Sequence, residues 1–400
     1  MKPGSRMLLS ISAIMMAALT LRIIYTSISP LQLDIQGELG ASFSEFGMLS
    51  ALPQFCAGVF SFALPFLLKR FTPEQIAAMG LGLMCILIAT PVLVSSLGWL
   101  YFVVILVGAG IAFTQPALQA VIKHHFPDRS MQMVALTILC MHMGSSIAAF
   151  TTHGFSISLG NWRWSLFLFG LVMLSSAIIW ILTFRSDIQQ HISAANRPAR
   201  PVTRHLYFDK ITWLIVLYFV SSGIIYISLL AWLPNFFYSI LPDKQHAANM
   251  LGVFVFNQAI AAFVLTLFAR DHWNKRQLLY LAGALTLCGV AIALLADTRW
   301  AMAFPLLCGL GLGISFPVAM TLPHLYGDNP HETATLSMFA LGVGSTLCAP
   351  FPFLIGWLKD ISNNPDILLW VTLVSAMTMI LVIPGFKPRQ VLVELDQKAG

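Results

Sequence analysis

Long apolar runs dominate this chain of 400 residues and leave only short polar segments between them. A helix needs ~20 mostly apolar residues to cross ~30 Å of hydrocarbon, and these runs are of that size. They do not alternate as barrel strands do, so backbone bonding in lipid requires helices. The twelve expected spans are 8–33, 45–68, 75–95, 99–122, 131–158, 163–184, 211–238, 247–269, 277–296, 300–325, 333–358 and 365–385.

The composition excludes a soluble enzyme and a disordered chain. Only 10% of the residues are Asp, Glu, Lys or Arg, against ~25% in soluble domains. A chain this apolar cannot remain solvated. The first run shows no small-residue cleavage site, so we expect an uncleaved first span. All six cysteines fall within expected spans, where they serve as small apolar residues and not as a disulfide or metal framework.

The positive charges predict the orientation in the membrane. With the N-terminus inside, 17 of the 22 Lys and Arg residues lie in cytoplasmic segments, while four, Arg163, Lys244, Arg299 and Lys359, lie outside. Positive charge is retained on the cytoplasmic side, so both termini are expected in the cytoplasm. The protein itself is expected in the cell (inner) membrane. The net charge of +6 is explained by topology and by anionic lipid, and it gives no argument for nucleic acid.

A polar interruption divides the chain into two halves. We expect an N-terminal six-helix half at 1–184, a basic cytoplasmic linker at 185–210, a C-terminal six-helix half at 211–386 and a cytoplasmic tail at 387–400.

The two halves repeat at an offset of about 201 residues. Residues 23–27 match residues 224–228, and Gly108, Gly110 and Pro116 match Gly309, Gly311 and Pro317. With a one-residue shift, 144–146 match 344–346. Duplicated halves in secondary transporters place the substrate at their interface near the midplane.

Five motifs occur in order along the chain. They are Leu21-Arg22 with Thr26 and Pro30-Leu31; residues 69–74 after the second span; 108–112 with Ile122-Lys123 and Phe126-Pro127; residues 231–234; and Gly309, Gly311 and Gly313 before Phe316-Pro317. Together they resemble the cyanate and nitroimidazole transporter branch of the major facilitator superfamily. The resemblance implies an all-α membrane protein with twelve transmembrane helices in two pseudo-symmetric six-helix halves.

The loop after the second span departs from the superfamily pattern. Its Asp is missing and Thr72 replaces a Gly, although Lys69 and Arg70 remain. The resemblance implies an inner gating loop here, with Glu74 acting as the acid and pairing with Lys69 or Arg129. A solvated, unpaired loop is the alternative, because exposed ion pairs contribute only ~0–1 kcal/mol.

Arg22 is the one charged residue deep within an expected span, because all the others fall in loops or at span ends. A charge at the bilayer centre costs at least ~2.5–3.5 kcal/mol on insertion scales, and no carboxylate lies at that depth in a span to neutralise it. Its counter-ion is most simply an anionic substrate, since a guanidinium offers bidentate donors to carboxylate-like groups. The alternative is a structural Arg bonded to helix carbonyls or packed on Tyr25 or Tyr226. The matching residue in the second half is Gly223, so the charge occurs once.

Several polar side chains complete the expected substrate site. The candidates around Arg22 are Tyr25, Thr26, Ser27, Gln115, Tyr226 and Ser228. Helix-to-helix hydrogen bonding is the alternative for each of them, and it is the expected role of Gln54 and of Asn257-Gln258.

His142 lies near the middle of the fifth span. It is a candidate for proton coupling because imidazole gains and loses a proton near neutral pH. A neutral packing residue is the alternative.

The sequence therefore predicts a secondary transporter of a small anionic or polar solute. An exporter of lipophilic compounds is the rival within transport, suggested by 12% aromatic residues. A membrane-embedded enzyme is disfavoured, since no span carries a catalytic dyad or metal cluster. A receptor or channel is also disfavoured, since no added domain or charged filter ring is recognisable. The expected partners are a small-molecule solute and the bilayer, with no nucleic acid, cofactor or metal, and with the protein acting as a monomer.

Orientation can be tested by cysteine labelling. In a version without the six native cysteines, single cysteines at Glu38, Asp243 and Asp360 should react with an impermeant reagent added outside intact cells. Cysteines at Arg197 and Lys275 should react only after permeabilisation. Reversed labelling would show that the orientation is wrong.

Overall fold

The computed structural model describes residues 3–61, 63–68, 70–188, 209–268, 274–295, 300–326, 330–362 and 364–386. Within these ranges the regular secondary structure is helical. Lys69, most of the linker (189–208) and the tail (387–400) lie outside the described residues.

The N-terminal half follows the expected spans, several of which consist of consecutive shorter helices. In chain order its elements are α1 (Pro3–Thr20), α2 (Ile23–Ser27), η1 (Ser29–Leu31), α3 (Gln32–Leu39), α4 (Phe43–Ser61), α5 (Leu64–Leu67), α6 (Pro73–Met84), η2 (Cys85–Ala89), α7 (Thr90–Leu93), α8 (Leu97–His125), η3 (Pro127–Arg129), α9 (Ser130–Leu159), α10 (Trp162–Thr183) and α11 (Arg185–Ile188).

The C-terminal half has fewer breaks in its first three spans. Its elements are α12 (Lys210–Tyr238), α13 (Lys244–Phe268), α14 (Lys275–Leu295), α15 (Ala303–Ala319), α16 (Leu322–Tyr326), α17 (Pro330–Cys348), α18 (Phe351–Ser362), α19 (Ile367–Val382) and η6 (Ile383–Gly385). Within the described ranges, ten helices are long and apolar enough to cross a membrane, and α15 is a shorter apolar helix. Together with α4 they correspond to the twelve expected spans.

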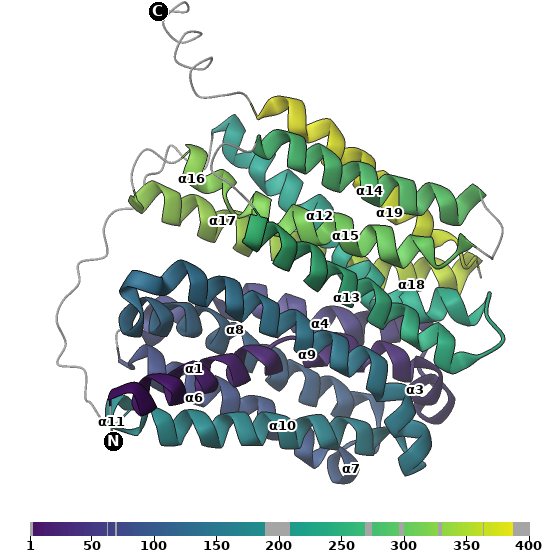
Figure 1. The fold of residues 1–400 in the computed structure, drawn as a ribbon. Coiled ribbons are helices and arrows are strands. Elements are labelled where there is room, and N and C mark those ends of the chain that lie inside the picture. The colour runs from purple at the N-terminus through teal and green to yellow at the C-terminus, as the bar shows by residue number, and fades with distance from the viewer. Residues whose placement is uncertain are drawn as a thin grey trace, which may run out of the picture.

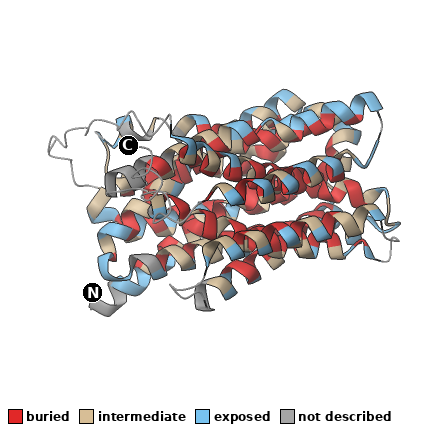
Figure 2. Cartoon of the chain, turned by 90° about the horizontal axis from the view of Figure 1, so that it is seen from above, coloured by how far each residue is buried: buried red, intermediate tan, exposed pale blue. Residues whose placement is uncertain are grey.

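The two halves form two layers of roughly aligned helices (Figure 1). The layers converge toward the end where α3 and α18 lie, and they spread apart toward α11 and α16. Buried residues gather inside the bundle and exposed ones on its outer faces (Figure 2). Many of the exposed side chains are large and apolar, for example Phe66, Leu182 and Leu381. Such faces are expected of helices whose solvent is lipid.

Equivalent glycines make equivalent helix contacts in the two halves. A Cβ on Gly108 would collide with α4, and one on Gly309 would collide with α13. Gly110 likewise approaches α6 closely, as Gly311 approaches α14. The fourth helix of each half therefore packs on the second and third helices through small residues, as close packing in membranes requires.

One end of the bundle is closed by a helix cap that crosses between the halves; we call it the Asp360 end, and the opposite end the linker end. Asp360 in α18 accepts hydrogen bonds from the backbone N–H groups of Phe43 (2.9 Å) and Ser44 (2.8 Å). The next N–H, of Glu45, donates to Ser42 Oγ (3.2 Å), and Glu45 Oε2 accepts from the Ser42 N–H (2.9 Å). The free donors at the start of α4 are thus satisfied by both halves.

Lys359 reinforces this contact. It is 5% exposed, and its Nζ donates a hydrogen bond to Asn235. The same Nζ lies 4.9 Å from the ring centroid of Trp232 and 5.7 Å from that of Phe43. Ring faces stabilise a desolvated ammonium by cation–π attraction. Because Phe43 belongs to the other half, the lysine holds the two halves together at this end.

Removing the Asp360 carboxylate should favour conformations open at this end. Loss of a helix cap costs about 1 kcal/mol, so Asp360→Ala should raise the open population several-fold. We would measure it by electron–electron distances between spin labels at the exposed positions Ser95 and Lys244, one in each half, in a version without native cysteines.

The matched control is Asp366→Ala. Asp366 is an exposed acid at the same end, and its side chain makes no capping hydrogen bond to α19. Its removal should leave the distances unchanged. Identical distance distributions in the two variants would show that the Asp360 cap does not control this end.

Candidate functional site

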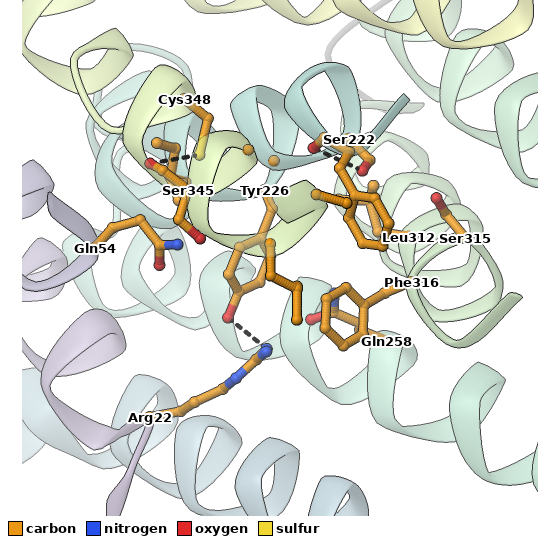
Figure 3. Close-up of a pocket in the computed structure, with 16 residues that line it drawn as sticks. Arg22, Gln54, Ser222, Tyr226, Gln258, Leu312, Ser315, Phe316, Ser345 and Cys348 are labelled. Carbon is orange, nitrogen blue, oxygen red and sulfur yellow. Dashed lines mark hydrogen bonds between the residues drawn. The ribbon is translucent and has the colours of Figure 1, made fainter. Parts of the chain in front are cut away.

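A pocket lies between the two halves, at the depth where the first span is interrupted (Figure 3). Arg22 and Gln54 contribute from the N-terminal half, while α12, α13, α15 and α17 supply the remaining wall. It holds about 620 Å³ of space free of protein atoms, part of which is open to solvent.

The first span breaks at Arg22. Helix α1 ends at Thr20 and α2 begins at Ile23, and Arg22 has non-helical dihedral angles (φ −114°, ψ 0°). The matching helix, α12, runs without a break past Gly223, which lines the same pocket. Discontinuous helices at the midplane are typical of transporter binding sites, because they free backbone groups and aim side chains into a cavity.

The guanidinium of Arg22 reaches across the interface to the C-terminal half (Figure 3). Its Nη1 donates a hydrogen bond to the Tyr226 hydroxyl (2.8 Å). Its Cζ lies 5.1 Å from the ring centroid of Tyr226 and 5.8 Å from that of Phe316. A guanidinium carries five N–H donors, and this is the one hydrogen bond that Arg22 makes among the described residues. The other donors are available to a ligand.

The rest of the pocket wall is uncharged. No carboxylate lines it within the described part of the chain. Gln54 and Gln258 provide amides, Ser222 and Ser345 provide hydroxyls, and Phe219 adds an aromatic face. The pocket therefore presents one fixed positive charge, neutral hydrogen-bonding groups and ring faces.

Two of the predicted site residues, Arg22 and Tyr226, line the pocket. Tyr25 does not line it, although it is near enough to both of them to interact electrostatically.

The other predicted site residues lie elsewhere. Thr26 is buried and donates a hydrogen bond to the Ser145 carbonyl (2.9 Å), which joins α2 to α9. Ser27 is buried and bonds to the Ile24 carbonyl (3.4 Å). Ser228 is buried, with no hydrogen-bond partner for Oγ among the described residues. Gln115 is exposed and outside the pocket.

Several pocket residues are not among the site residues that the sequence predicts. Gln54 and Gln258 are expected there as helix contacts, and Ser222, Ser315 and Phe219 carry no sequence signal. Two sequence features do coincide with the pocket wall: the repeated segment at 344–346, which includes Ser345, and the motif that contains Phe316.

Comparison with known proteins decides the family. The family model for the Major Facilitator Superfamily matches residues 11–335. The chain belongs to the major facilitator superfamily. An uncharacterized transporter of Bacillus subtilis, YycB, is 28% identical over 384 residues, covering 94% of this chain and 91% of that protein.

Two superfamily relatives from Escherichia coli have named substrates. The cyanate transport protein CynX is 26% identical over 353 residues, covering 88% of this chain and 90% of its own length. The 2-nitroimidazole transporter is 26% identical over 379 residues, covering 94% and 95%. These matches confirm the resemblance predicted from the motifs, and they make the chain a membrane transport protein.

Solved structures of transporters share the fold. A point mutant of the nucleoside transporter NupG matches with a TM-score of 0.73 at 11% identity, covering 94% of this chain and 98% of that one. A bacterial homolog of the lysosomal transporter Spinster, inward-facing and unoccupied, matches with a TM-score of 0.67 at 15% identity, covering 96% and 95%. The predicted twelve-helix superfamily fold is confirmed.

In the loop after the second span, Glu74 contacts residues other than the basic ones expected from the superfamily pattern. Glu74 is 3% exposed, and its Oε1 lies 3.1 Å from His125 Nε2 and 3.6 Å from His124 Nδ1. Arg70 and Arg129 are exposed, and Lys69 lies outside the described residues. Within the described residues the acid therefore pairs with histidines from α8 and not with Arg129.

His142 lies in α9 and is 3% exposed. Its Nδ1 has no hydrogen-bond partner among the described residues. The imidazole interacts electrostatically with Arg22. It does not line the pocket.

Proposed function

We propose that this protein is a secondary active transporter that carries a small monovalent anion across the inner membrane by alternating access. Arg22 binds the charge of the solute. The single observation that carries the proposal is the Arg22 guanidinium, which meets no carboxylate among the described residues and keeps donors free in a pocket between the halves.

The electrostatics favour an anion over a neutral or cationic solute. A charge held near the midplane costs at least ~2.5–3.5 kcal/mol unless it is compensated. Tyr226 compensates in part, through its hydroxyl and its ring. Since the hydroxyl accepts from Arg22, its own proton is free to be donated to a bound anion.

The pocket wall favours a compact solute. Amides and hydroxyls of Gln54, Gln258 and Ser345 can orient polar atoms, while Phe219 and Phe316 contact a flat or apolar part. Two relatives are named for cyanate, a small anion, and for 2-nitroimidazole, a small polar ring. Both chemistries are compatible with one guanidinium among neutral groups. The aromatic faces are also what favours the second candidate, an exporter of lipophilic compounds.

The arrangement of the halves supports alternating access. Hydrogen bonds between them occur at Arg22 and toward the Asp360 end, where Tyr238 donates to the Pro30 carbonyl (3.0 Å). The positive-charge distribution favours an orientation with the Asp360 end outside and both termini in the cytoplasm. With that orientation the protein is closed outside and faces inward. Closing the linker end would complete the transport cycle.

Replacing Arg22 tests the anion site. Arg22→Lys keeps the charge but lacks the planar fork, and losing one charge-assisted hydrogen bond of about 1.5–3 kcal/mol weakens binding roughly ten- to a hundredfold. Arg22→Leu should abolish binding and keep the fold. Cyanate should raise the Tm of the natural protein and leave that of the Leu variant unchanged, and uptake should fall in the same order.

Two outcomes contradict the anion proposal. A Leu variant that fails to fold while the Lys variant binds normally would assign Arg22 a structural role. Stabilisation by lipophilic compounds and not by any small anion would favour the exporter. Lys244→Leu, which removes an exposed positive charge, is the control and should match the natural protein.

His142 is proposed as the proton-coupling residue. Because no carboxylate lines the pocket among the described residues, proton-driven transport needs this imidazole or a proton carried by the solute. His142→Gln should abolish uphill accumulation in membrane vesicles and preserve exchange of pre-loaded solute. His153→Gln is the matched control, since His153 is also buried in α9 with an unpaired Nδ1 within the described part of the chain. Unchanged accumulation in His142→Gln would make His142 a packing residue.

A further inference from the structure

Glu74, His124 and His125 converge at the linker end of the N-terminal half, away from the pocket. Glu74 lies in the first turn of α6, and the two histidines are the last residues of α8. Each residue offers one possible ligand atom, and these three atoms lie within 4.8 Å of one another. We propose that these residues form a binding site for a divalent transition-metal ion such as Zn²⁺.

The two distances from Glu74 fit the geometry of a small metal ion, and the donor atoms of His124 and His125 lie within 4.8 Å of each other. With metal–ligand bonds of about 2.0–2.1 Å, neighbouring ligands of a tetrahedral Zn²⁺ lie about 3.4 Å apart. The two measured separations from Glu74 Oε1, 3.1 Å to His125 Nε2 and 3.6 Å to His124 Nδ1, fall on either side of that value. A single carboxylate oxygen therefore faces one nitrogen of each histidine.

The surroundings fix two ligands and leave the third adjustable. Trp180 Nε1 donates to the Glu74 carbonyl (3.0 Å), and the His125 ring packs on Phe184 with centroids 5.2 Å apart. The His124 side chain is 73% exposed, against 4% for Glu74. His124 can therefore rotate onto an ion arriving from solution, and water can fill the remaining coordination position.

The donor set selects the class of metal. Two imidazole nitrogens and one carboxylate oxygen suit Zn²⁺, Co²⁺, Ni²⁺ and Cu²⁺, whereas Mg²⁺ and Ca²⁺ prefer oxygen ligands alone. A bound ion would join α6 to α8 beside the start of the linker, because Gln75 Nε2 donates to the Ile188 carbonyl (2.6 Å) in α11. The site is independent of Arg22 and of the solute that the pocket takes.

Metal titration of the purified full-length protein tests the proposal. The protein would carry an affinity tag without histidine and be stripped with chelator. Zn²⁺ alone, followed by calorimetry, should bind at one ion per chain with micromolar or tighter affinity, and Mg²⁺ alone should not bind. Co²⁺ alone should develop the visible absorption of a four- or five-coordinate ion.

Variants separate this site from other histidines. His124→Gln removes an exposed ligand without disturbing the Glu74–His125 contact, and it should weaken Zn²⁺ binding at least tenfold. Glu74→Gln should weaken it similarly. His246→Gln, at an exposed histidine that pairs with Asp243, should bind like the natural protein. Absence of stoichiometric Zn²⁺ binding, or equal affinity in His124→Gln and His246→Gln, would overturn the proposal.

Discussion

The structure is organised around one charge that the bilayer does not tolerate alone. Arg22 belongs to the N-terminal half, yet the groups that stabilise it, the Tyr226 hydroxyl and the rings of Tyr226 and Phe316, belong to the C-terminal half. Its stabilisation thus depends on the two halves being together at this depth. In the transport cycle that we propose, such a residue would respond both to the solute and to the relative position of the halves.

At the Asp360 end, too, groups of one half are stabilised by groups of the other, but these groups are backbone N–H donors and not a buried charge. At the start of α4, backbone donors that need partners receive them from Asp360 of the other half. When this end opens, water can replace the carboxylate, so the contact holds the halves together without making their separation prohibitive. A buried ion pair there would be harder to break, since parting it leaves a desolvated charge. Capping contributes about 1 kcal/mol, a size suited to two states of similar stability.

The spans and the key charge were predictable from the sequence because both depend on hydropathy alone. Arg22 stands out in the sequence because it is a charged residue inside a long apolar run. The break at that residue was not predictable, since residues 18–23 contain no Gly or Pro. The sequence also did not predict which side of each helix faces the pocket. Ser228 and Gln115 lie at plausible depths, but Ser228 is buried outside the pocket and Gln115 is exposed. The partners of Glu74 depend on tertiary packing of α6 against α8, which local spacing does not encode.

The repeat shows how a duplicated fold acquires an asymmetric site. Glycine contacts between the second, third and fourth helices recur in both halves, because helix packing constrains both copies alike. The pocket is free of that constraint, and there the copies differ: the first half supplies Arg22 at a break, while the second supplies Gly223 and an unbroken α12. A side chain at Gly223 would press on the Cys348 Sγ, which a Cβ would approach to 3.1 Å. One half therefore provides the charge and the other provides the space. In the site that we propose, a single small anion would meet one guanidinium, whereas two symmetric arginines would repel each other.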